Sequence, residues 1–405
     1  MSTIFPSVKA VGEGKTEKIF YLTAKTVTRA VAEDSIRLLA GNGLRFKSVT
    51  LRAKNKICFC EEPVCNPDAC RYARGHYDRV NDALLELLQN NDLVTPAVVE
   101  KYAHKHTVCP YELALDVSLW ADMVVCDYNH VFDPVVYLRR FFNNDAGDYV
   151  FLIDEAHNLV DRVRDMYTTE VRASAFRQLR KQLKEEKTAP SVQLRKAAGS
   201  VIKYLSDVKK ALGEKQQSTE KEPDALLGVL LKVFAQAAEE WLAAEKYHLS
   251  PLQNEVLELF FQVRGFLDIA ELYDERYVTL TEAFGHELVR TLLCLDPSEI
   301  IRQKLKLAQA SVLFSATLTP LPYYREILGG EEGDYLMALP SPYEQERLLL
   351  LAHGGISTKY TDRERSCQPI ADLLYAATAQ KKGNYMVYFP SYAYLQQVYA
   401  RFTET

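Results

Sequence analysis

Short apolar runs that end in small polar or acidic residues recur along this chain and restrict its fold. Runs of this length are typical of strands buried on both faces of a sheet. Amphipathic stretches such as 27–43 separate them, and alternation of strands with helices favours an α/β fold with a parallel sheet covered on both faces. The runs interpreted as strands are 18–26, 47–52, 122–126, 149–153 and 310–316.

Residues 170–300 have a different, helical pattern. Two long amphipathic stretches, 226–247 and 254–273, are strongly apolar, so we expect them to pack together. Since predicted strands flank this block, it is expected to be an insertion between two strands of one sheet. A further apolar run, 384–391, predicts the first strand of a second α/β domain.

The composition excludes some classes of protein. Of 405 residues, 48% are hydrophobic, and the formal net charge of -5 lacks the basic excess of many nucleic-acid-binding modules, so any such contact must come from local patches. Neither a membrane-spanning run nor a secretory signal is evident, which predicts a cytoplasmic protein without membrane contact. Thiols stay reduced there, so clustered cysteines indicate metal, whereas the isolated Cys126, Cys294 and Cys367 are expected to be small buried hydrophobes.

Asp154, Glu155, Ala156 and His157 directly follow an apolar run. The carboxyl ends of parallel strands face the ligand crevice, where an aspartate can hold Mg²⁺ on nucleotide phosphates. The neighbouring glutamate can orient and deprotonate an attacking water, and His157 can report the nucleotide state to nearby loops. The alternative interpretation is a strand end followed by a helix cap.

The segment from Gly12 to Thr16, GEGKT, resembles a phosphate-binding P-loop only superficially. Lys9 stands where the first glycine of that motif belongs, a helix-like stretch precedes the segment, and a strand follows it, which inverts the required context. We therefore interpret Lys15 as a solvated turn lysine. Residues 1–11 are typical of the helix that follows a P-loop, and truncation is the simplest explanation of the missing loop.

Five of the eight cysteines lie within about fifty residues, with the pattern C-x-C-x₄-C-x₄-C and then one distant thiol before a proline. The paired C-x₂-C knuckles of zinc ribbons do not occur in it. Four thiolates on irregular loops suit an iron–sulfur cluster, with a zinc site or incidental thiols as alternatives. The five are Cys58, Cys60, Cys65, Cys70 and Cys109.

Basic and aromatic side chains surround these cysteines. Cations for phosphates beside aromatic faces for bases are typical of single-strand binding, with a solvated basic face as the alternative. Arg71, Tyr72 and Arg74 are the nearest candidates. The full set is Arg45, Lys47, Arg52, Lys54, Lys56, Arg71, Arg74, Arg79, Lys101, His104, Lys105 and His106, interleaved with Tyr72, Tyr77 and Tyr102.

These motifs occur in a characteristic order: cysteine cluster, CDYNHVFDP, DEAH, helical insertion and FSATLTP. In this order, and over nearly the whole chain, the sequence resembles the XPD/DinG iron–sulfur DNA helicases. The resemblance matches Cys58, Cys70 and Cys109 to cluster ligands, with Cys65 as the remaining ligand and Cys60 as its rival. It matches Ser315, Ala316 and Thr317 to the motif that couples ATP hydrolysis to DNA movement, and YLTAKT, with Thr23, Lys25 and Thr26, to a motif that touches DNA.

The resemblance implies a DEAH-box motor that hydrolyses ATP with Mg²⁺ and moves 5′ to 3′ on single-stranded DNA. It further implies a 4Fe-4S cluster, single-stranded and forked DNA as partners, a monomeric state and a role in DNA repair. The expected domains are RecA-like motor domain 1 in 1–52, 111–168 and 303–330, an iron–sulfur domain in 53–110, a helical arch in 169–302 and the start of motor domain 2 in 331–405.

The sequence also departs from that family. It shows neither the P-loop lysine and threonine nor the late motifs that supply arginines to the γ-phosphate, so the polypeptide alone is expected to be an inactive fragment. Two other functions remain open. One is a non-enzymatic, metal-containing nucleic-acid-binding module with a degenerate motor, and the other is a zinc-stabilised interaction protein with a helical docking block.

Overall fold

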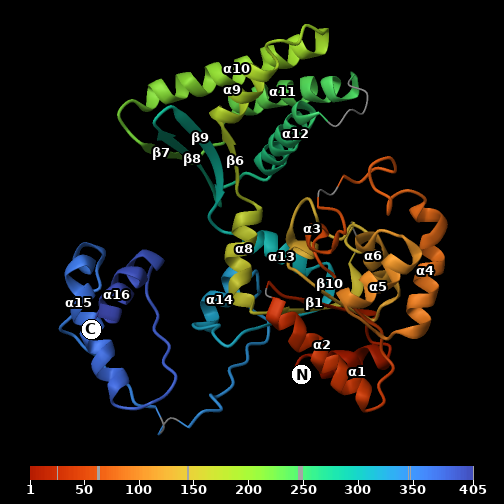
Figure 1. Ribbon diagram of the computed structural model, residues 1–405, viewed down its shortest axis with the longest axis vertical. Coiled ribbons are helices and arrows are strands. Elements are labelled where there is room, and N and C mark those ends of the chain that lie inside the picture. Colours follow the sequence, from red (N-terminus) through yellow and green to blue (C-terminus); the bar gives the residue numbers. More distant parts are fainter. Residues whose placement is uncertain are drawn as a thin grey trace. The chain divides into compact units, whose positions relative to one another are not determined.

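The computed structural model describes residues 1–24, 26–61, 64–143, 146–244, 250–344, 346 and 348–404, without the side chains of 26 and 27. The chain forms two compact units, Met1–Tyr335 and Leu336–Thr405. A six-stranded parallel sheet with the strand order β10-β5-β1-β4-β2-β3 forms the base of the first unit (Figure 1). Its strands are β1 (Lys18–Leu22), β2 (Ser48–Thr50), β3 (Leu93–Val94), β4 (Met123–Cys126), β5 (Gly147–Asp154) and β10 (Ala308–Phe314).

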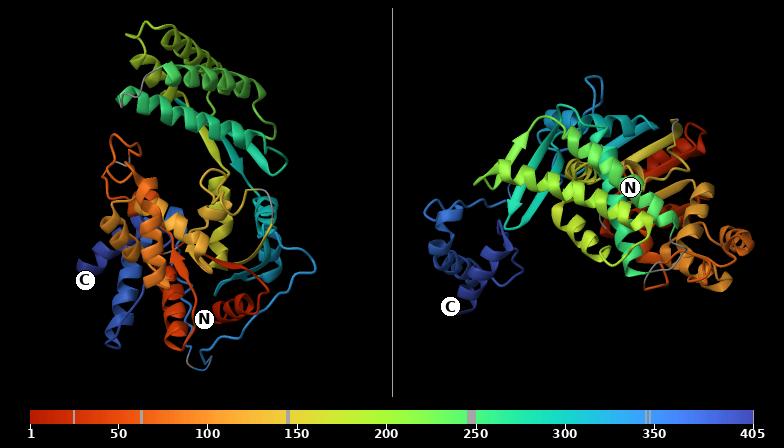
Figure 2. Two further views of the ribbon diagram at one scale, coloured as in Figure 1. Left: turned by 90° about the vertical axis from the view of Figure 1, so that its right-hand side faces the viewer. Right: turned by 90° about the horizontal axis from the view of Figure 1, so that it is seen from above.

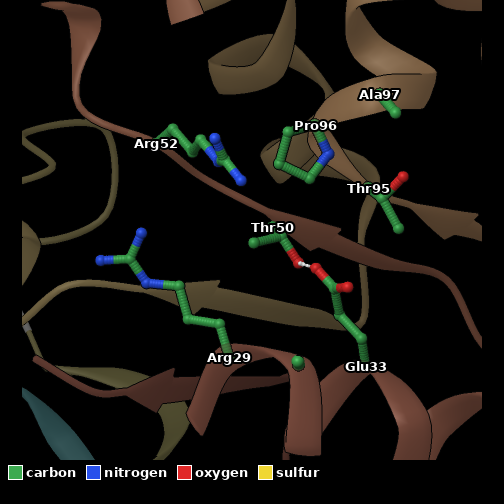
Figure 3. A pocket seen from close by; sticks show the side chains of 8 residues that line it. Arg29, Glu33, Thr50, Arg52, Thr95, Pro96 and Ala97 are labelled. Atoms are coloured by element: carbon green, nitrogen blue, oxygen red, sulfur yellow. Dashed lines mark hydrogen bonds between the residues drawn. The ribbon is translucent and has the colours of Figure 1, made fainter. Parts of the chain in front are cut away.

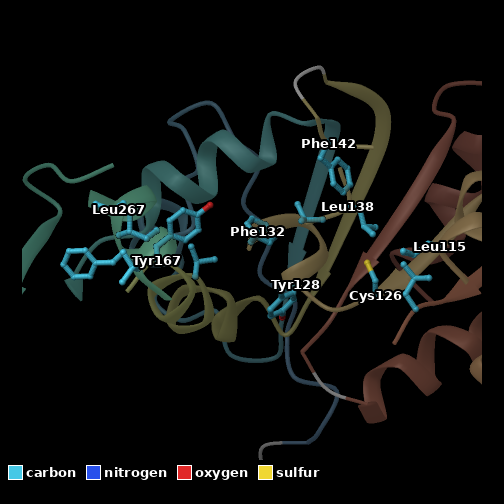
Figure 4. Packing of buried hydrophobic residues seen from close by; sticks show 14 of the residues in the cluster. Leu115, Cys126, Tyr128, Phe132, Leu138, Phe142, Tyr167 and Leu267 are labelled. Atoms are coloured by element: carbon cyan, nitrogen blue, oxygen red, sulfur yellow. The ribbon is translucent and has the colours of Figure 1, made fainter. Parts of the chain in front are cut away.

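Side chains of β1 alternate between two buried layers, as a strand covered on both faces requires. Ile19 and Tyr21 pack with Ile4 of α1 and Ile36 of α2. Phe20 and Leu22 point into the larger core on the opposite face. That core contains Phe132 and Phe142 and continues through Tyr128 to Tyr167 and Leu267 (Figure 4). The helices around the sheet are α1 (Ile4–Gly12), α2 (Thr26–Gly41), α3 (Lys54–Ile57), α4 (His76–Asn90), α5 (Pro96–His106), α6 (Pro110–Trp120), α7 (Asn129–Phe132), α8 (Leu159–Met166), α13 (Ser298–Leu305) and α14 (Leu321–Ile327).

The five predicted strands are confirmed as β1, β2, β4, β5 and β10, although β1 ends at Leu22 and α2 begins soon after it. β10 pairs in parallel with β5, with Leu313 beside Ile153. Because these partners are far apart in sequence, the block between them is an insertion, as expected. The two-residue edge strand β3 was not predicted, since it is too short to produce a recognisable pattern.

The prediction of a purely helical block at 170–300 is wrong. It also contains an antiparallel sheet with the order β6-β9-β8-β7, in which β8 and β9 form a hairpin with Gly285 in the left-handed region. Tyr277, Thr279 and Thr281 alternate with less buried neighbours, a period-two signal that the adjacent long helices obscured. The strands are β6 (Thr169–Arg172), β7 (Gln217–Glu220), β8 (Tyr277–Phe284) and β9 (Glu287–Cys294).

The two predicted amphipathic stretches form α11 and α12, which contact each other as expected, and α10 also contacts α11 (Figure 1). Two helix starts follow the usual capping rule, because the Thr188 side chain accepts a hydrogen bond from Ser191 N and Ser250 accepts one from Gln253 N. The helices are α9 (Ala173–Gln182), α10 (Ala189–Leu212), α11 (Ala225–Ala244) and α12 (Pro251–Ala270).

The second unit contains α15 (Arg363–Ala379) and α16 (Tyr392–Glu404), which pack through Cys367, Ala371, Tyr394 and Val398. The predicted strand at 384–391 is not observed; residues 384–389 are irregular, and Tyr388 and Met386 are exposed. A strand needs a neighbour for its backbone groups, and the described residues of this unit contain no other strand. None of the helices in the described ranges is long and apolar enough to cross a membrane.

Candidate active site and cysteine segment

Asp154 is the last residue of β5, and its carboxylate is held by a neighbouring strand. Tyr21 of β1 donates a hydrogen bond from its hydroxyl to Asp154 Oδ2 at 2.7 Å, and Asp154 Oδ1 accepts one from Glu155 N at 2.9 Å. Burial and the nearby Asp154 carboxylate raise the pKa of Tyr21, so its hydroxyl remains a donor. The two contacts fix the direction of a carboxylate that is only partly buried.

Glu155 adopts a left-handed backbone conformation with φ of 52°. This region is unfavourable for a residue with a Cβ, so neighbouring groups must hold it. Tyr128, which follows β4, donates its hydroxyl to the carbonyl oxygens of Asp154 and Glu155. The backbone N–H of Asn158 donates to the Glu155 carbonyl at 2.9 Å and closes the turn.

A hydrogen-bonded chain connects the acid pair to β10. His157 Nδ1 lies 2.6 Å from Ser315 Oγ, and the Ser315 hydroxyl donates to Glu155 Oε2 at 3.4 Å. Thr317 Oγ1 lies 3.5 Å from His157 Nδ1. Ala316, which lies between Ser315 and Thr317 in the sequence, is exposed. The structure therefore brings together residues separated by about 160 positions in the sequence.

The GEGKT segment lies at the opposite edge of the sheet from Asp154. It connects α1 to β1, and Thr16 Oγ1 donates to the carbonyl of Asp148 at 2.6 Å, at the amino end of β5. Lys15 is exposed and pairs with Glu13. The predicted helix before and strand after this segment are confirmed, and its backbone amides are not at the edge that carries the acid pair.

Of the three predicted DNA contacts after β1, Lys25 and the Thr26 side chain lie outside the described residues. Thr23 is fully buried and its hydroxyl contacts that of Thr28, so its DNA contact stays a prediction. A partly buried ion-pair network, which the sequence did not reveal, lies beside it: Asp127 pairs with Arg29 at 3.2 Å and with the exposed Arg162 at 3.4 Å.

Near the cysteines, Arg71 is exposed and lies over the ring of Tyr72 at 4.8 Å. Tyr72 itself is buried, and its hydroxyl lies 3.4 Å from His104 Nδ1. The Arg74 guanidinium donates to the carbonyls of Pro67 and Asp68 and holds that loop. Of the two arginines among these three predicted DNA contacts, Arg74 holds a loop through its guanidinium, whereas Arg71 is exposed and only stacks on Tyr72.

The thiols of the cysteine segment form two neighbouring groups. Cys60 Sγ lies 3.9 Å from Cys70 Sγ, and burial together with Cys70 and Cys58 raises the pKa of Cys60 to about 11. Cys65 is exposed and hydrogen-bonds to Lys54, and it also affects Cys109, whose pKa is raised mainly by burial. Both rivals for the second ligand position therefore lie beside an expected ligand, and the choice between Cys65 and Cys60 stays open.

The chemistry of this donor set fits an all-thiolate cluster, since five thiols stand on loops and helix ends of one segment. His76 Nδ1 accepts the hydrogen bond of Cys109 N at 3.2 Å, which fixes the start of α6. Across the described ranges, no three His, Cys, Asp or Glu side chains are grouped as in a formed metal site. The three isolated cysteines, Cys126, Cys294 and Cys367, are buried, as predicted.

Comparisons with known proteins show what this chain is similar to. The family model DEAD_2 matches residues 44–176, a range that contains both the cysteine segment and the acid pair. ATP-dependent DNA helicase XPD of Sulfolobus acidocaldarius is 23% identical over 372 residues, with 87% of this chain and 62% of that protein covered. This chain is a distant homologue of the XPD-type helicases.

Two further helicases are similar to this chain. ATP-dependent DNA helicase CHL1 of Coccidioides immitis is 21% identical over 339 residues, covering 74% of this chain and 39% of that protein. The solved structure of an XPD helicase superposes with a TM-score of 0.52 at 17% identity, covering 98% of this chain and 69% of the other, which supports the fold. The chain thus spans between about two fifths and three fifths of the length of these two helicase sequences.

Proposed function

We propose that this chain is a motor component of an ATP-dependent DNA helicase that moves 5′ to 3′ on single-stranded DNA. The carrying observation is the acid pair at the carboxyl end of β5, hydrogen-bonded through Ser315 and His157 to the segment after β10. The alternative interpretation, in which Asp154 only caps a helix, requires neither the left-handed backbone of Glu155 nor hydrogen bonds between the ends of β5 and β10. The helicase names of its relatives give the expected reaction.

The two carboxylates have different tasks in this proposal. Asp154, oriented by Tyr21, would hold Mg²⁺, which neutralises charge on the nucleotide phosphates when bound. Glu155 orients and deprotonates the attacking water, and its carboxylate is positioned by the turn that Tyr128 and Asn158 hold. His157 and Ser315 carry the resulting displacement to Thr317, at the start of the coupling segment.

The cysteine segment is proposed to hold a 4Fe-4S cluster on Cys58, Cys70, Cys109 and either Cys65 or Cys60. Its role here is structural: four thiolates on one cluster would fasten the loops between α3 and α6. The exposed Arg71 and the basic surface around it are then available for the DNA backbone. We also propose the domain boundaries that the sequence indicated: the iron–sulfur domain, 53–110, and the arch, 169–302, are both inserted into motor domain 1.

Strand preference tests this proposal on the chain itself. Fluorescence anisotropy with a labelled single-stranded oligonucleotide and with a duplex of equal length, at low salt, is expected to show tighter binding to the single strand. Cations and aromatic faces on separate loops suit unpaired nucleotides better than a duplex. Undetectable binding to the single strand, or a preference for the duplex, would contradict the proposed function.

A further inference from the structure

The insertion between β5 and β10 is joined to the rest of the first unit by two connections. The chain enters the insertion after α8, which is drawn in yellow in Figure 2, and returns from it through β9 and α13. A pocket of about 210 Å³, here called the joint pocket, is lined by residues from both sides of this joint. Tyr167 directly follows α8, Arg276 and Tyr277 stand at the start of β8, and Lys304 lies on α13.

A second pocket, at the carboxyl end of β2, belongs to the edge of the sheet that carries the acid pair. Arg29, Glu33 and Arg52 border it (Figure 3). Only β1 and β4 separate β2 from β5, so this pocket shares an edge with Asp154 and is part of the proposed motor site. The described residues that line the joint pocket include none from that site, so its occupant is a separate question.

Lys304 gives the joint pocket a positive charge without a close counter-ion. Its ammonium lies 4.7 Å from the centre of the Tyr137 ring, and no ion pair is recorded for it in the part of the chain that the structure describes. Burial lowers the pKa of Lys304, and the carboxylate that opposes this effect, Asp133, accepts the backbone N–H groups of Val135 and Val136. A partly buried cation in this situation favours an anionic occupant.

Two tyrosines of the joint pocket have hydroxyl groups without a strong acceptor. Tyr277 is 2% exposed, and its hydroxyl has no oxygen or nitrogen partner among the described residues. The thiol of Cys294 beside it is only a weak acceptor. Tyr167 is also buried, and no hydrogen bond is recorded for its hydroxyl within the same ranges. Because buried donors without acceptors are costly, an oxygen-bearing anion beside these hydroxyls would be stabilised.

The other charged groups of the joint pocket are already engaged. Glu299 is the one carboxylate among the described lining residues, and its oxygens accept hydrogen bonds from Arg302 at 2.6 Å and from Gln303 at 3.2 Å. Arg276 donates to both carboxylate oxygens of Asp274. These contacts neutralise Glu299 and Arg276 locally and leave Lys304 as the charge that selects the occupant.

Size and apolar surface define the class of ligand. A volume of about 210 Å³ is below the roughly 300 Å³ at which pockets for drug-sized ligands begin. Leu272 and Ile300 border the space, and the rings of Tyr167 and Tyr277 add aromatic surface. A fitting occupant therefore combines one anionic group with a compact apolar body, rather than being an inorganic ion alone.

We propose that the joint pocket binds a small aromatic carboxylate, with its carboxylate near Lys304 and the Tyr277 hydroxyl and its ring against Leu272 and Ile300. The inference goes beyond the proposed function and does not depend on it. Tyr277 belongs to the insertion, whereas Lys304 belongs to α13, so the occupant contacts both sides of the joint. It would thereby favour one arrangement of the insertion on the rest of the first unit.

Ligand-detected NMR titration of the full chain with benzoate, and with its neutral analogue benzamide, tests the class of ligand. Benzoate is expected to bind with a Kd on the order of 1 mM, as its small size allows. Benzamide is expected to bind about tenfold more weakly, because it offers Lys304 no charge. Equal affinity for the two compounds, or no binding of benzoate, would overturn the proposal.

Two lysines near the end of α13 provide matched variants that test the location. Lys304→Gln is expected to weaken benzoate binding about tenfold. Lys306→Gln removes the same charge at an exposed pair with Glu331 and is expected to change the affinity less than about twofold. Equal effects of the two lysine variants would show that benzoate does not occupy the joint pocket.

Tyr277→Phe is the second test of the location. It removes a hydroxyl that has no strong partner in the protein, so it is expected to keep the fold and to weaken benzoate binding about fivefold. Circular dichroism checks that all three variants are folded. Unchanged benzoate affinity in Tyr277→Phe would contradict the proposed position of the carboxylate.

Discussion

Glu155 shows how single residues set this site. Its left-handed backbone is maintained by a tyrosine that follows another strand, Tyr128, and the adjacent Asp154 is held by Tyr21. The sequence predicted the acids, because they follow an apolar run, but not the tyrosines. Tyr21 and Tyr128 reach Asp154 only because the strand order places β1 between β5 and β4.

Replacement of Glu155 tests the division of tasks between the carboxylates. In a protein that carries this chain together with a P-loop, Glu155→Gln is expected to lower ATP turnover by about 10² or more, since loss of a general base typically costs 10²–10⁴. Nucleotide affinity should stay within about twofold, because the proposed metal ligand, Asp154, is unchanged in this variant. Steady-state ATPase assays and nucleotide titration measure the two effects. Turnover equal to that of the parent would reject the base assignment.

His130 provides a residue-scale prediction about pH. It is buried after β4, its Nδ1 lies 3.3 Å from the Asp127 carbonyl, and burial lowers its pKa below the ordinary 6.5 despite the nearby Asp127 and Asp133. The unfolded chain therefore binds more protons below about pH 6.5, so this contribution to stability is present above that pH and is lost as pH falls.

The expected result is a lower urea midpoint at pH 5 than at pH 7, with a smaller difference in His130→Gln. Glutamine keeps a donor for the Asp127 carbonyl but cannot gain a proton in this range. The comparison concerns the pH dependence, so a uniform loss of stability in the variant does not affect it. An unchanged pH difference in the variant would show that His130 does not titrate on unfolding.

At the scale of elements, the periodicity of apolar residues predicted the strands and helices whose pattern is regular and contained within their own segment. The strands β1, β4 and β5 followed from apolar runs, and α11 and α12 followed from amphipathic spacing. The hairpin β8–β9 was missed because the adjacent long helices obscured its period-two signal, and the edge strands β6 and β7 were missed because they are brief and pair with strands far away in sequence. Short edge strands depend on tertiary pairing more than on their own residues.

A buried ion pair connects that second sheet to α11. The side chains of Arg290 and Asp224 are 4% and 5% exposed and lie 2.8 Å apart. Asp224 also accepts hydrogen bonds from Leu227 N and the Tyr204 hydroxyl, so it caps α11 while holding Arg290. Burial opposes the charge of Arg290, but Glu220 and Asp224 raise its pKa overall.

Arg290→Ala is expected to destabilise the first unit by about 3 kcal/mol or more, because it leaves Asp224 buried without its cation. The matched control is Arg276→Ala, which breaks a more exposed pair with Asp274, at 26% and 29% side-chain exposure, and should cost about 1 kcal/mol or less. Urea denaturation followed by circular dichroism compares the variants. Similar losses in both would mean that burial of the Arg290 pair has little energetic weight.

At the scale of the whole molecule, distant segments converge on one sheet: the loops near the cysteines, the acid pair and the segment after β10 all extend from a single first unit. The order of motifs allowed the family to be predicted from sequence. The ligand choice between Cys60 and Cys65 could not be predicted, since it depends on how irregular loops fold around a cluster. The irregular structure of residues 384–389 could not be predicted either, because an apolar run forms a strand only where another strand pairs with it, and the described part of the second unit contains none.

Iron and acid-labile sulfide content after anaerobic purification tests the central claim most directly. We predict about four iron and four sulfide per chain, as a 4Fe-4S cluster requires. Cys70→Ser should lose most of both, whereas Cys126→Ser, at a buried thiol within β4, should retain them. A colourless parent protein that holds one zinc and no sulfide, or full iron retention by Cys70→Ser, would contradict the account.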